Sequence, residues 1–97
     1  MRKYGKVDTN HRAIVDALRA SGALVISLAS QGGGVPDILV YTGSRSVTGE
    51  FKLLEVKGPN GKLTEDQSKF MVLGWPVHIV RSPQGALDAV WGVERGP

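Results

Sequence analysis

The sequence predicts an α/β fold in which helices flank a mixed β-sheet, with the element order αβββαβα. Two observations predict this fold. The first half of the chain holds three apolar, β-prone segments separated by turn residues, a pattern that is typical of hairpins. The second half alternates a helical pattern, one more strand and a last helix, as a β-α-β crossover does. Together they indicate a sheet that contains both strand directions.

The first helix is expected after a loose basic arm at residues 1–7. Any of Asp8, Thr9 and Asn10 can cap its start, because a short polar side chain accepts a hydrogen bond from the free backbone N–H groups. Gly22 can end the helix, since glycine adopts the left-handed conformation that is common there. The inner positions follow helical spacing: Ile14, Ala17, Leu18 and Ser21.

Turn-forming residues delimit the three strands that follow. A Gly-rich bend ends the first strand, a polar loop ends the second, and a Gly-Pro-Asn-Gly turn ends the third. The strands are therefore expected at residues 23–29, 35–41 and 51–57.

The second helix is expected to begin at Thr64-Glu65-Asp66-Gln67, which matches the capping-box pattern, and to extend to about Leu73. A short strand at residues 77–80 follows. Ser82-Pro83 then begins the last helix, because proline is favoured in the first helical turn. Its inner face is expected to consist of Ala86, Leu87, Val90 and Trp91.

Composition restricts the classes of function. The 97 residues allow a single domain over residues 1–97, and a 41% hydrophobic fraction is enough for one core. Without cysteine there is no disulfide, zinc–thiolate site or thiol nucleophile. No apolar run reaches the roughly 18 residues of a membrane span, and no signal peptide is evident, so we expect a cytoplasmic protein. The net charge of +3 favours an anionic partner such as nucleic acid.

Two charged clusters lie within apolar strands: Pro36-Asp37 and Glu55-Val56-Lys57. Burying an unpaired carboxylate or ammonium group costs several kcal/mol, so such groups need partners or a metal ion. Proline fixes the backbone before Asp37 and can present its carboxylate rigidly at the start of a strand. Two carboxylates and a lysine at one sheet edge would form a divalent-cation site of the kind used in phosphodiester cleavage.

Alternation along the third strand places Glu55 and Lys57 on one face. Phe51 and Leu53 share that face, and we expect it to be a core face that opens into a cleft. A purely structural interpretation is also available, in which Asp37 is a turn residue and Glu55 and Lys57 form an ion pair. The order and spacing of all three residues together favour the catalytic interpretation.

Gly34-Val35-Pro36-Asp37 followed by Glu55-Val56-Lys57 resembles the signature of the PD-(D/E)XK nucleases. The compact context resembles the VRR-NUC branch, whose small nucleases are found alone in phages and fused to repair enzymes elsewhere. The resemblance extends from the first helix through Val80-Arg81-Ser82 and implies a restriction-endonuclease-like core.

The resemblance also implies roles at individual positions. Asp37 and Glu55 would bind Mg²⁺ or Mn²⁺, with the backbone carbonyl of Val56 as a further ligand; hard oxygen donors suit these ions. Lys57 would position or help deprotonate the attacking water. Gln67 matches a polar residue that this branch directs back into the site. Gln67 is also the capping-box glutamine, and the two roles are compatible.

Two further sets of residues stay open as candidates. Related resolvases carry a glutamate near the start of the first helix, where this chain has Asn10 or His11, so a third acidic ligand is not evident. Arg45, Lys62 and Arg81 flank the proposed cleft in the sequence and could bind DNA phosphates, although isolated surface cations often bind nothing specific.

Other conspicuous residues receive structural interpretations. The bend at residues 31–34 lacks the lysine and helix of a phosphate-binding P-loop, so it is expected to be a flexible turn. His78 lies in a short apolar strand and is expected in the core, and Trp75 is expected to pack in a corner beside Pro76.

The implied activity is that of a metal-dependent DNA endonuclease, similar to the Holliday-junction resolvases. Symmetric incision of a junction needs two sites, which favours a homodimer. If the chain is phage-encoded, its location is the host cytoplasm. The alternatives are a non-catalytic nucleic-acid-binding module of the same fold and a small basic structural protein. A metal-free nuclease is disfavoured by the acidic pair.

Overall fold

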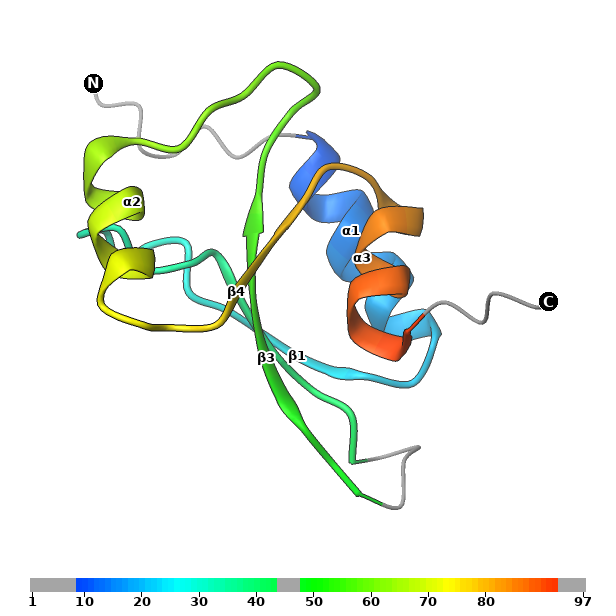
Figure 1. Cartoon of the computed structure of the whole chain (residues 1–97). Helices are drawn as coiled ribbons and strands as arrows, with labels where there is room; N and C mark the ends of the chain where they lie inside the picture. Colours follow the sequence, from blue (N-terminus) through cyan, green and yellow to red (C-terminus); the bar gives the residue numbers. More distant parts are fainter. Residues whose placement is uncertain (1–8, 44–47, 93–97) are drawn as a thin grey trace, which may run out of the picture.

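The computed structural model describes residues 9–43 and 48–92 and contains seven elements in the predicted order (Figure 1). The elements are α1 (Thr9–Ala20), β1 (Leu24–Ser27), β2 (Ile38–Tyr41), β3 (Phe51–Val56), α2 (Glu65–Val72), β4 (Val77–Val80) and α3 (Pro83–Trp91). None of the described helices is both long enough and apolar enough to span a bilayer.

The four strands form one sheet in the order β1-β2-β3-β4. β1, β2 and β3 pair antiparallel as consecutive hairpins, whereas β4 pairs parallel with β3 after the crossover through α2. A parallel neighbour needs such a crossover because a tight turn can only reverse the chain. The predicted α/β class, mixed sheet and element order are thus confirmed.

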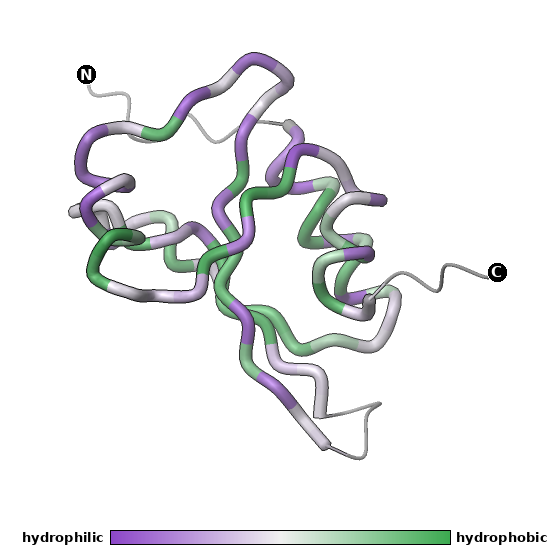
Figure 2. The backbone as a smooth tube through the Cα atoms, viewed as in Figure 1, coloured by the Kyte–Doolittle hydropathy of each residue, from purple (hydrophilic) through white to green (hydrophobic). Residues whose placement is uncertain are grey.

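The core lies between one face of the sheet and the pair of helices α1 and α3 (Figure 1). Ile14 and Leu18, one helical turn apart on α1, are completely buried against it. On α3 the predicted inner residues are buried or half-buried, and the indole Nε1 of Trp91 donates a hydrogen bond to Ser21 Oγ at 2.8 Å. Figure 2 shows hydrophobic segments on the strands and on the helices that pack against them, as well as at the end of α2. The buried strand residues are Val25, Ile38, Val40, Leu54, Val56 and Val80.

The prediction for the faces of β3 was wrong. Leu54 is completely buried and Val56 nearly so, whereas Phe51, on the face expected to form the core, is 69% exposed. Apolar residues occur on both faces of this strand, so alternation alone cannot identify the covered face. The packing of α1 and α3 on the same side decides it. His78 is also exposed rather than in the core.

Helix α2 lies on the other side of the sheet from α1 and α3 (Figure 1), and none of its residues is buried. Its start is fixed by the predicted capping box on Thr64. The Gly-rich bend packs closely against the first turn of α2. Gly34 has a φ of +85°, and a Cβ built there would collide with the carbonyl group of Asp66. Only glycine permits both the left-handed backbone and this close approach. The bend therefore makes a close backbone contact with α2 and is not simply a flexible turn.

Candidate active site

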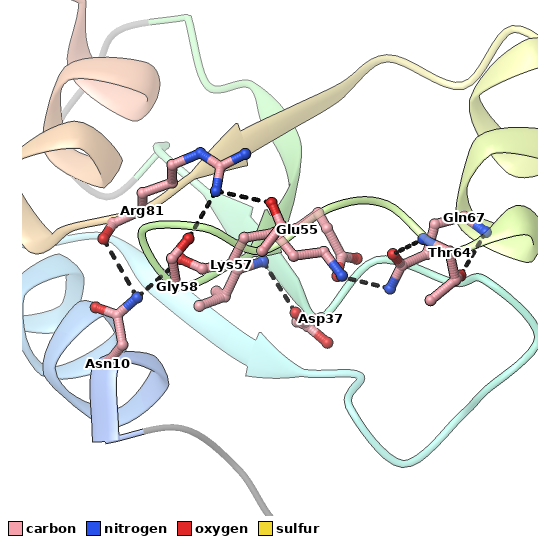
Figure 3. A network of polar contacts seen from close by, with 10 residues as sticks. Asn10, Asp37, Glu55, Lys57, Gly58, Thr64, Gln67 and Arg81 are labelled. Carbon is pink, nitrogen blue, oxygen red and sulfur yellow. Dashed lines mark hydrogen bonds and ion pairs between the residues drawn. The ribbon is translucent and has the colours of Figure 1, made fainter.

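Asp37 is held by two hydrogen bonds just before β2 begins. Its backbone carbonyl accepts from the Leu28 N–H at 2.6 Å, and its carboxylate Oδ2 accepts from the Val56 N–H at 2.9 Å (Figure 3). Pro36, directly before it, is fully buried and fixes the approach of the chain. The carboxylate thus continues the β2–β3 ladder by one further bond and lies beside the end of β3.

Glu55 is the acidic residue on β3 and is only 3% exposed. Its Oε2 atom accepts a hydrogen bond from Gln67 Nε2 at 2.8 Å and lies 3.6 Å from the ammonium Nζ of Lys57. Glu55 and Lys57 are two residues apart on an extended chain, so their side chains share a face as predicted. The charged groups are therefore paired within the protein and largely excluded from water.

Burial controls the electrostatics of this pair. The pKa of Glu55 is raised from 4.5 to about 7, first by desolvation and second by the negative charge of Asp37. Lys57 lowers the pKa of Glu55 but does not compensate for both effects. The pocket that contains Glu55 is lined in part by the apolar residues Leu63, Phe70 and Val77. Two neighbouring carboxylates with one ammonium group leave an excess of negative charge, which either a proton or a cation can neutralise.

Gln67 completes the capping box of α2 and also contacts Glu55. The side-chain Oε1 atom of Gln67 accepts from the backbone N–H of Thr64 at 2.8 Å. The backbone N–H of Gln67 donates to Thr64 Oγ1 at 3.1 Å, and the two bonds complete the capping box. Because the oxygen of the amide is used by the cap, the nitrogen Nε2 faces Glu55 (Figure 3). The start of α2 and the orientation of the Glu55 carboxylate are therefore fixed by one side chain.

The first helix contributes no carboxylate to the site, but its Asn10 side chain binds the backbone of two strands. Asn10 Nδ2 donates to the carbonyl groups of Lys57 at 3.0 Å and Arg81 at 3.3 Å, which ties together the ends of β3 and β4. The side chain of His11 is half-buried and forms no hydrogen bond or ion pair with Asp37, Glu55 or any other residue that the structure describes. Within the described ranges no three acidic or histidine side chains gather into a metal-binding group.

The cations proposed to bind DNA differ in their surroundings. Arg45 lies outside the described residues, and Lys62 is exposed. Arg81 is engaged by the protein itself: its Nη1 atom donates to the carbonyl groups of Gly58 at 2.6 Å and Gly61 at 3.0 Å. Arg81 thus shapes the turn that follows Lys57, a role that the sequence analysis missed. Contact of these cations with DNA stays a prediction.

The residues at the ends of β2 and β3 fit a divalent cation. Asp37 Oδ2 accepts from the Val56 N–H, and Glu55 lies next to Asp37 with a raised pKa. In an extended strand the N–H and C=O groups of one residue point to the same edge. The Val56 N–H points toward Asp37, so the Val56 carbonyl points to that side as well. Three hard oxygen donors are the chemistry that Mg²⁺ and Mn²⁺ require.

This combination of a mixed α/β sheet with two carboxylates and a lysine at one strand end is consistent with the PD-(D/E)XK class of nucleases. The model of the VRR-NUC domain matches residues 2–73, about three quarters of the chain, and the chain belongs to that family of nucleases. The match includes Asp37, Glu55, Lys57 and Gln67, whereas β4 and α3 lie beyond it. Neither the curated proteins nor the solved structures contain a match.

Proposed function

We propose that this chain is a Mg²⁺- or Mn²⁺-dependent endodeoxyribonuclease that forms a single domain and acts on branched DNA as a homodimer in the cytoplasm. The observation that carries the proposal is the placement of Asp37 and Glu55 beside Lys57 at the joint end of β2 and β3. Family membership supports nuclease activity, and the net charge of +3 suits a polyanionic substrate.

The metal ligands would be Asp37, Glu55 and the Val56 carbonyl. A bound divalent cation supplies Lewis acidity, which stabilises charge on the phosphate and makes a water molecule more acidic. The protein's own contribution is to hold these donors rigidly. Asp37 is fixed by the Val56 N–H and Glu55 by Gln67, so little reorganisation is needed when substrate arrives.

Lys57 would orient the attacking water or a phosphate oxygen through its ammonium group. Its side chain is 14% exposed and lies against Glu55, so its position is restricted while part of it remains accessible. Restricting a catalytic group in this way lowers the entropy lost on reaching the transition state. Asn10 restricts the backbone of the same residue, because its side chain donates a hydrogen bond to the Lys57 carbonyl.

The test is cleavage of labelled linear, flapped, forked and four-way DNA, with and without Mn²⁺. Asp37→Ala and Glu55→Ala are each expected to lower the cleavage rate by about a thousandfold or more, because loss of a metal ligand removes several kcal/mol of transition-state stabilisation. Glu50→Ala is the matched control, since the Glu50 side chain is exposed and forms an ion pair with Lys52 at 3.3 Å. Undiminished cleavage by either site variant would contradict the proposal.

Calorimetric titration with Mn²⁺ separates a nuclease from a non-catalytic module of the same fold. The nuclease is expected to release or absorb heat on binding Mn²⁺, and the Glu55→Ala variant is expected to lose that signal. DNA binding without any Mn²⁺ binding in the unmodified chain would favour the non-catalytic module.

A further inference from the structure

The connection between α2 and β4 carries an aromatic pair beside the candidate active site. The ring of Phe70 on α2 and the indole of Trp75 in the connection stack with their centroids 5.3 Å apart and an interplanar angle of 17°. One face of the indole is therefore in contact with Phe70. Trp75 nevertheless stays 51% exposed, so the opposite face of the indole is open to solvent.

The end of α2 explains why the two rings meet. Gly74 follows the helix with a φ of +112° and donates its N–H to the Met71 carbonyl at 3.0 Å. In helix ends of this kind the residue after the glycine commonly contacts the last turn. An aliphatic side chain would make the same contact, so the helix end does not account for a flat, half-exposed indole. Exposed tryptophan is typical of recognition surfaces, since most tryptophan in folded proteins is highly buried.

The aromatic pair belongs to the surroundings of Glu55. Phe70 lies three positions after Gln67 on α2, so both side chains occupy the same face of the helix. Gln67 Nε2 donates to Glu55 at 2.8 Å, and Phe70 lines the pocket that contains Glu55. A single stacked ring therefore separates the indole of Trp75 from this pocket.

The strand register limits the distance between Trp75 and the charged site. Ile79 is paired with Glu55 across β3 and β4, and neighbouring strands lie about 4.8 Å apart. Trp75 precedes Ile79 by four residues, which span at most about 14 Å. Trp75 and Glu55 thus lie within about 20 Å of each other, which is about six nucleotides of a stacked strand.

A nucleobase is the ligand that the exposed indole face suits best. Both are flat and aromatic, and stacking on an aromatic side chain strengthens binding by about five- to hundredfold per base. The exposed residues Val72 and Leu73 do not enlarge this surface, because they line a groove with Lys69 in which Trp75 has no part. The indole face is therefore the size of one base and lacks the broad area that a protein partner needs.

We propose that Trp75, backed by Phe70, stacks an unpaired base of the DNA substrate close to the cut. This assignment rests on the proposed nuclease function, since it names a substrate feature for the same site. Inside a duplex both faces of every base are already stacked, so only an unpaired or terminal base can offer a free face. Opening a base pair costs at least as much as one stacking contact returns, so Trp75 binds a base that is already unpaired. The substrate class is therefore flapped or forked DNA.

Binding of the full chain to labelled DNA in metal-free buffer tests the stacking contact. The probes are a flapped duplex and a blunt duplex of the same sequence, followed by fluorescence anisotropy. Trp75→Leu keeps an apolar contact at the end of α2 but removes the flat ring. It is expected to bind flapped DNA about tenfold more weakly and blunt DNA as the wild type does. Trp75→Phe retains an aromatic face and should retain most of the affinity. Val72→Ala is the matched control, since Val72 is 85% exposed but lies outside the stack, and it should bind both probes normally.

Abasic nucleotides in the flapped probe locate the stacked base. Each nucleotide within about six positions of the branch point is replaced in turn. One or two positions are expected to lower the affinity of the wild-type chain by about tenfold. The same positions should have no effect on Trp75→Leu, because base and indole are the two partners of one contact.

Cleavage kinetics with Mn²⁺ separate stacking from a purely structural role of Trp75. A contact that is equally strong before and during the reaction raises KM when it is lost and leaves kcat unchanged. Trp75→Leu is therefore expected to raise KM for flapped DNA alone. A structural role would instead displace Gln67 and lower kcat on every substrate.

Equal affinity of Trp75→Leu and the wild type for flapped DNA would overturn the proposal, as would equal losses on flapped and blunt DNA. The same loss in Val72→Ala would also overturn it and indicate a broad apolar contact, as a protein partner makes. Circular dichroism establishes that each variant is folded. If Trp75→Leu does not fold, the abasic series with the wild-type chain decides, and a series without any sensitive position rejects the stacking contact.

Failure of the stacking contact and failure of the nuclease function are distinguishable. Binding of flapped DNA that depends on Trp75, without any cleavage, would reject the nuclease function and leave the stacking contact standing. Metal-dependent cleavage that is identical in Trp75→Leu and the wild type on flapped DNA would reject the stacking contact and leave the nuclease function.

Discussion

The two faces of the sheet are built from the same strands but meet different requirements. On β3, Leu54 and Val56 point into a core that α1 and α3 seal completely. Leu53 and Glu55 alternate with them and point to the other face, which α2 alone of the described helices approaches. The sealed face carries the stability of the fold, and the open face carries the charged site and several exposed apolar side chains, among them Leu24, Ile26 and Phe51.

This contrast shows how the six-residue strand β3 contributes to the core with one face and to the charged site with the other. The buried positions of the core face on β2 and β3 are apolar, because a buried, unpaired charge costs several kcal/mol. The open face can hold Glu55 because Gln67 donates a hydrogen bond to its carboxylate and the ammonium group of Lys57 lies 3.6 Å from it. Substitutions on the two faces should therefore affect different properties.

The largest expected effects come from the neighbours Leu54 and Glu55. Leu54→Ala should lower the free energy of unfolding by about 2–5 kcal/mol, because it leaves a cavity in the core. Glu55→Gln should lower the cleavage rate by about a thousandfold, as loss of a metal ligand does, while its stability at pH 8 stays equal to the wild type or rises. Urea unfolding and a cleavage assay on both variants measure this separation.

A Glu55→Gln variant that unfolds as readily as Leu54→Ala would contradict the separation of the faces. Leu53→Ala is a further control. It removes the same number of atoms from the open face, where Leu53 is only half-buried, and should cost less than Leu54→Ala.

The second expected effect is a pH dependence that comes from Glu55. The pKa of Glu55 is about 7 in the folded protein against 4.5 as the reference, so the folded state binds the proton more tightly. This stabilisation is fully present below pH 4.5 and is lost as the pH rises through 7. The loss amounts to at most about 3 kcal/mol.

Metal-free unfolding measured from pH 4.5 to pH 8 tests this dependence, with the wild type compared to Glu55→Gln. The difference between the two curves isolates the contribution of Glu55. Glu65→Gln, at an exposed ion pair with Lys69, should follow the wild-type curve. A Glu55→Gln curve that also follows the wild type would show that the carboxyl group titrates normally. Mg²⁺ should restore part of the stability at pH 8.

A smaller effect is expected at Gly34, which supports α2 on the open face. Gly34→Ala requires a left-handed alanine and a displacement of the Asp66 carbonyl, which together should cost about 1–3 kcal/mol. The displacement should also move Gln67 away from Glu55 and lower the cleavage rate. Gly32→Ala is the matched control: Gly32 is left-handed too but has open space around it. It should cost stability without the same loss of cleavage.

The smallest expected effects come from alanine substitutions at the N-caps of α2 and α3, which should differ in their influence on cleavage. Thr64 and Ser82 are both N-cap residues whose side chains accept a backbone hydrogen bond. Replacing either with alanine should cost about 1 kcal/mol. Only Thr64→Ala should also reduce cleavage, because only α2 carries a residue that contacts Glu55. Equal cleavage by the two variants would show that the cap of α2 has no influence on the site.

Local patterns in the sequence were sufficient to predict the element order and the residues that meet at the site. Capping residues, turn residues and alternation are properties of short segments, and Asp37, Glu55 and Lys57 stood out because they interrupt apolar strands. The covered face of β3 could not be predicted in this way, because it depends on where α1 and α3 pack. The same holds for the support at Gly34 and for the bonds of Arg81, which connect residues 20 or more positions apart.

The shared use of Gln67 restricts what evolution or an engineer can place at that position. Glutamate is as good a capping-box residue as glutamine, so the helix alone would accept either. Glutamate would, however, set a third carboxylate against Glu55 in place of the amide donor that now lies 2.8 Å away. A substitution that is conservative for the helix would therefore replace a neutral hydrogen-bond donor with a negative charge beside the Glu55 carboxylate.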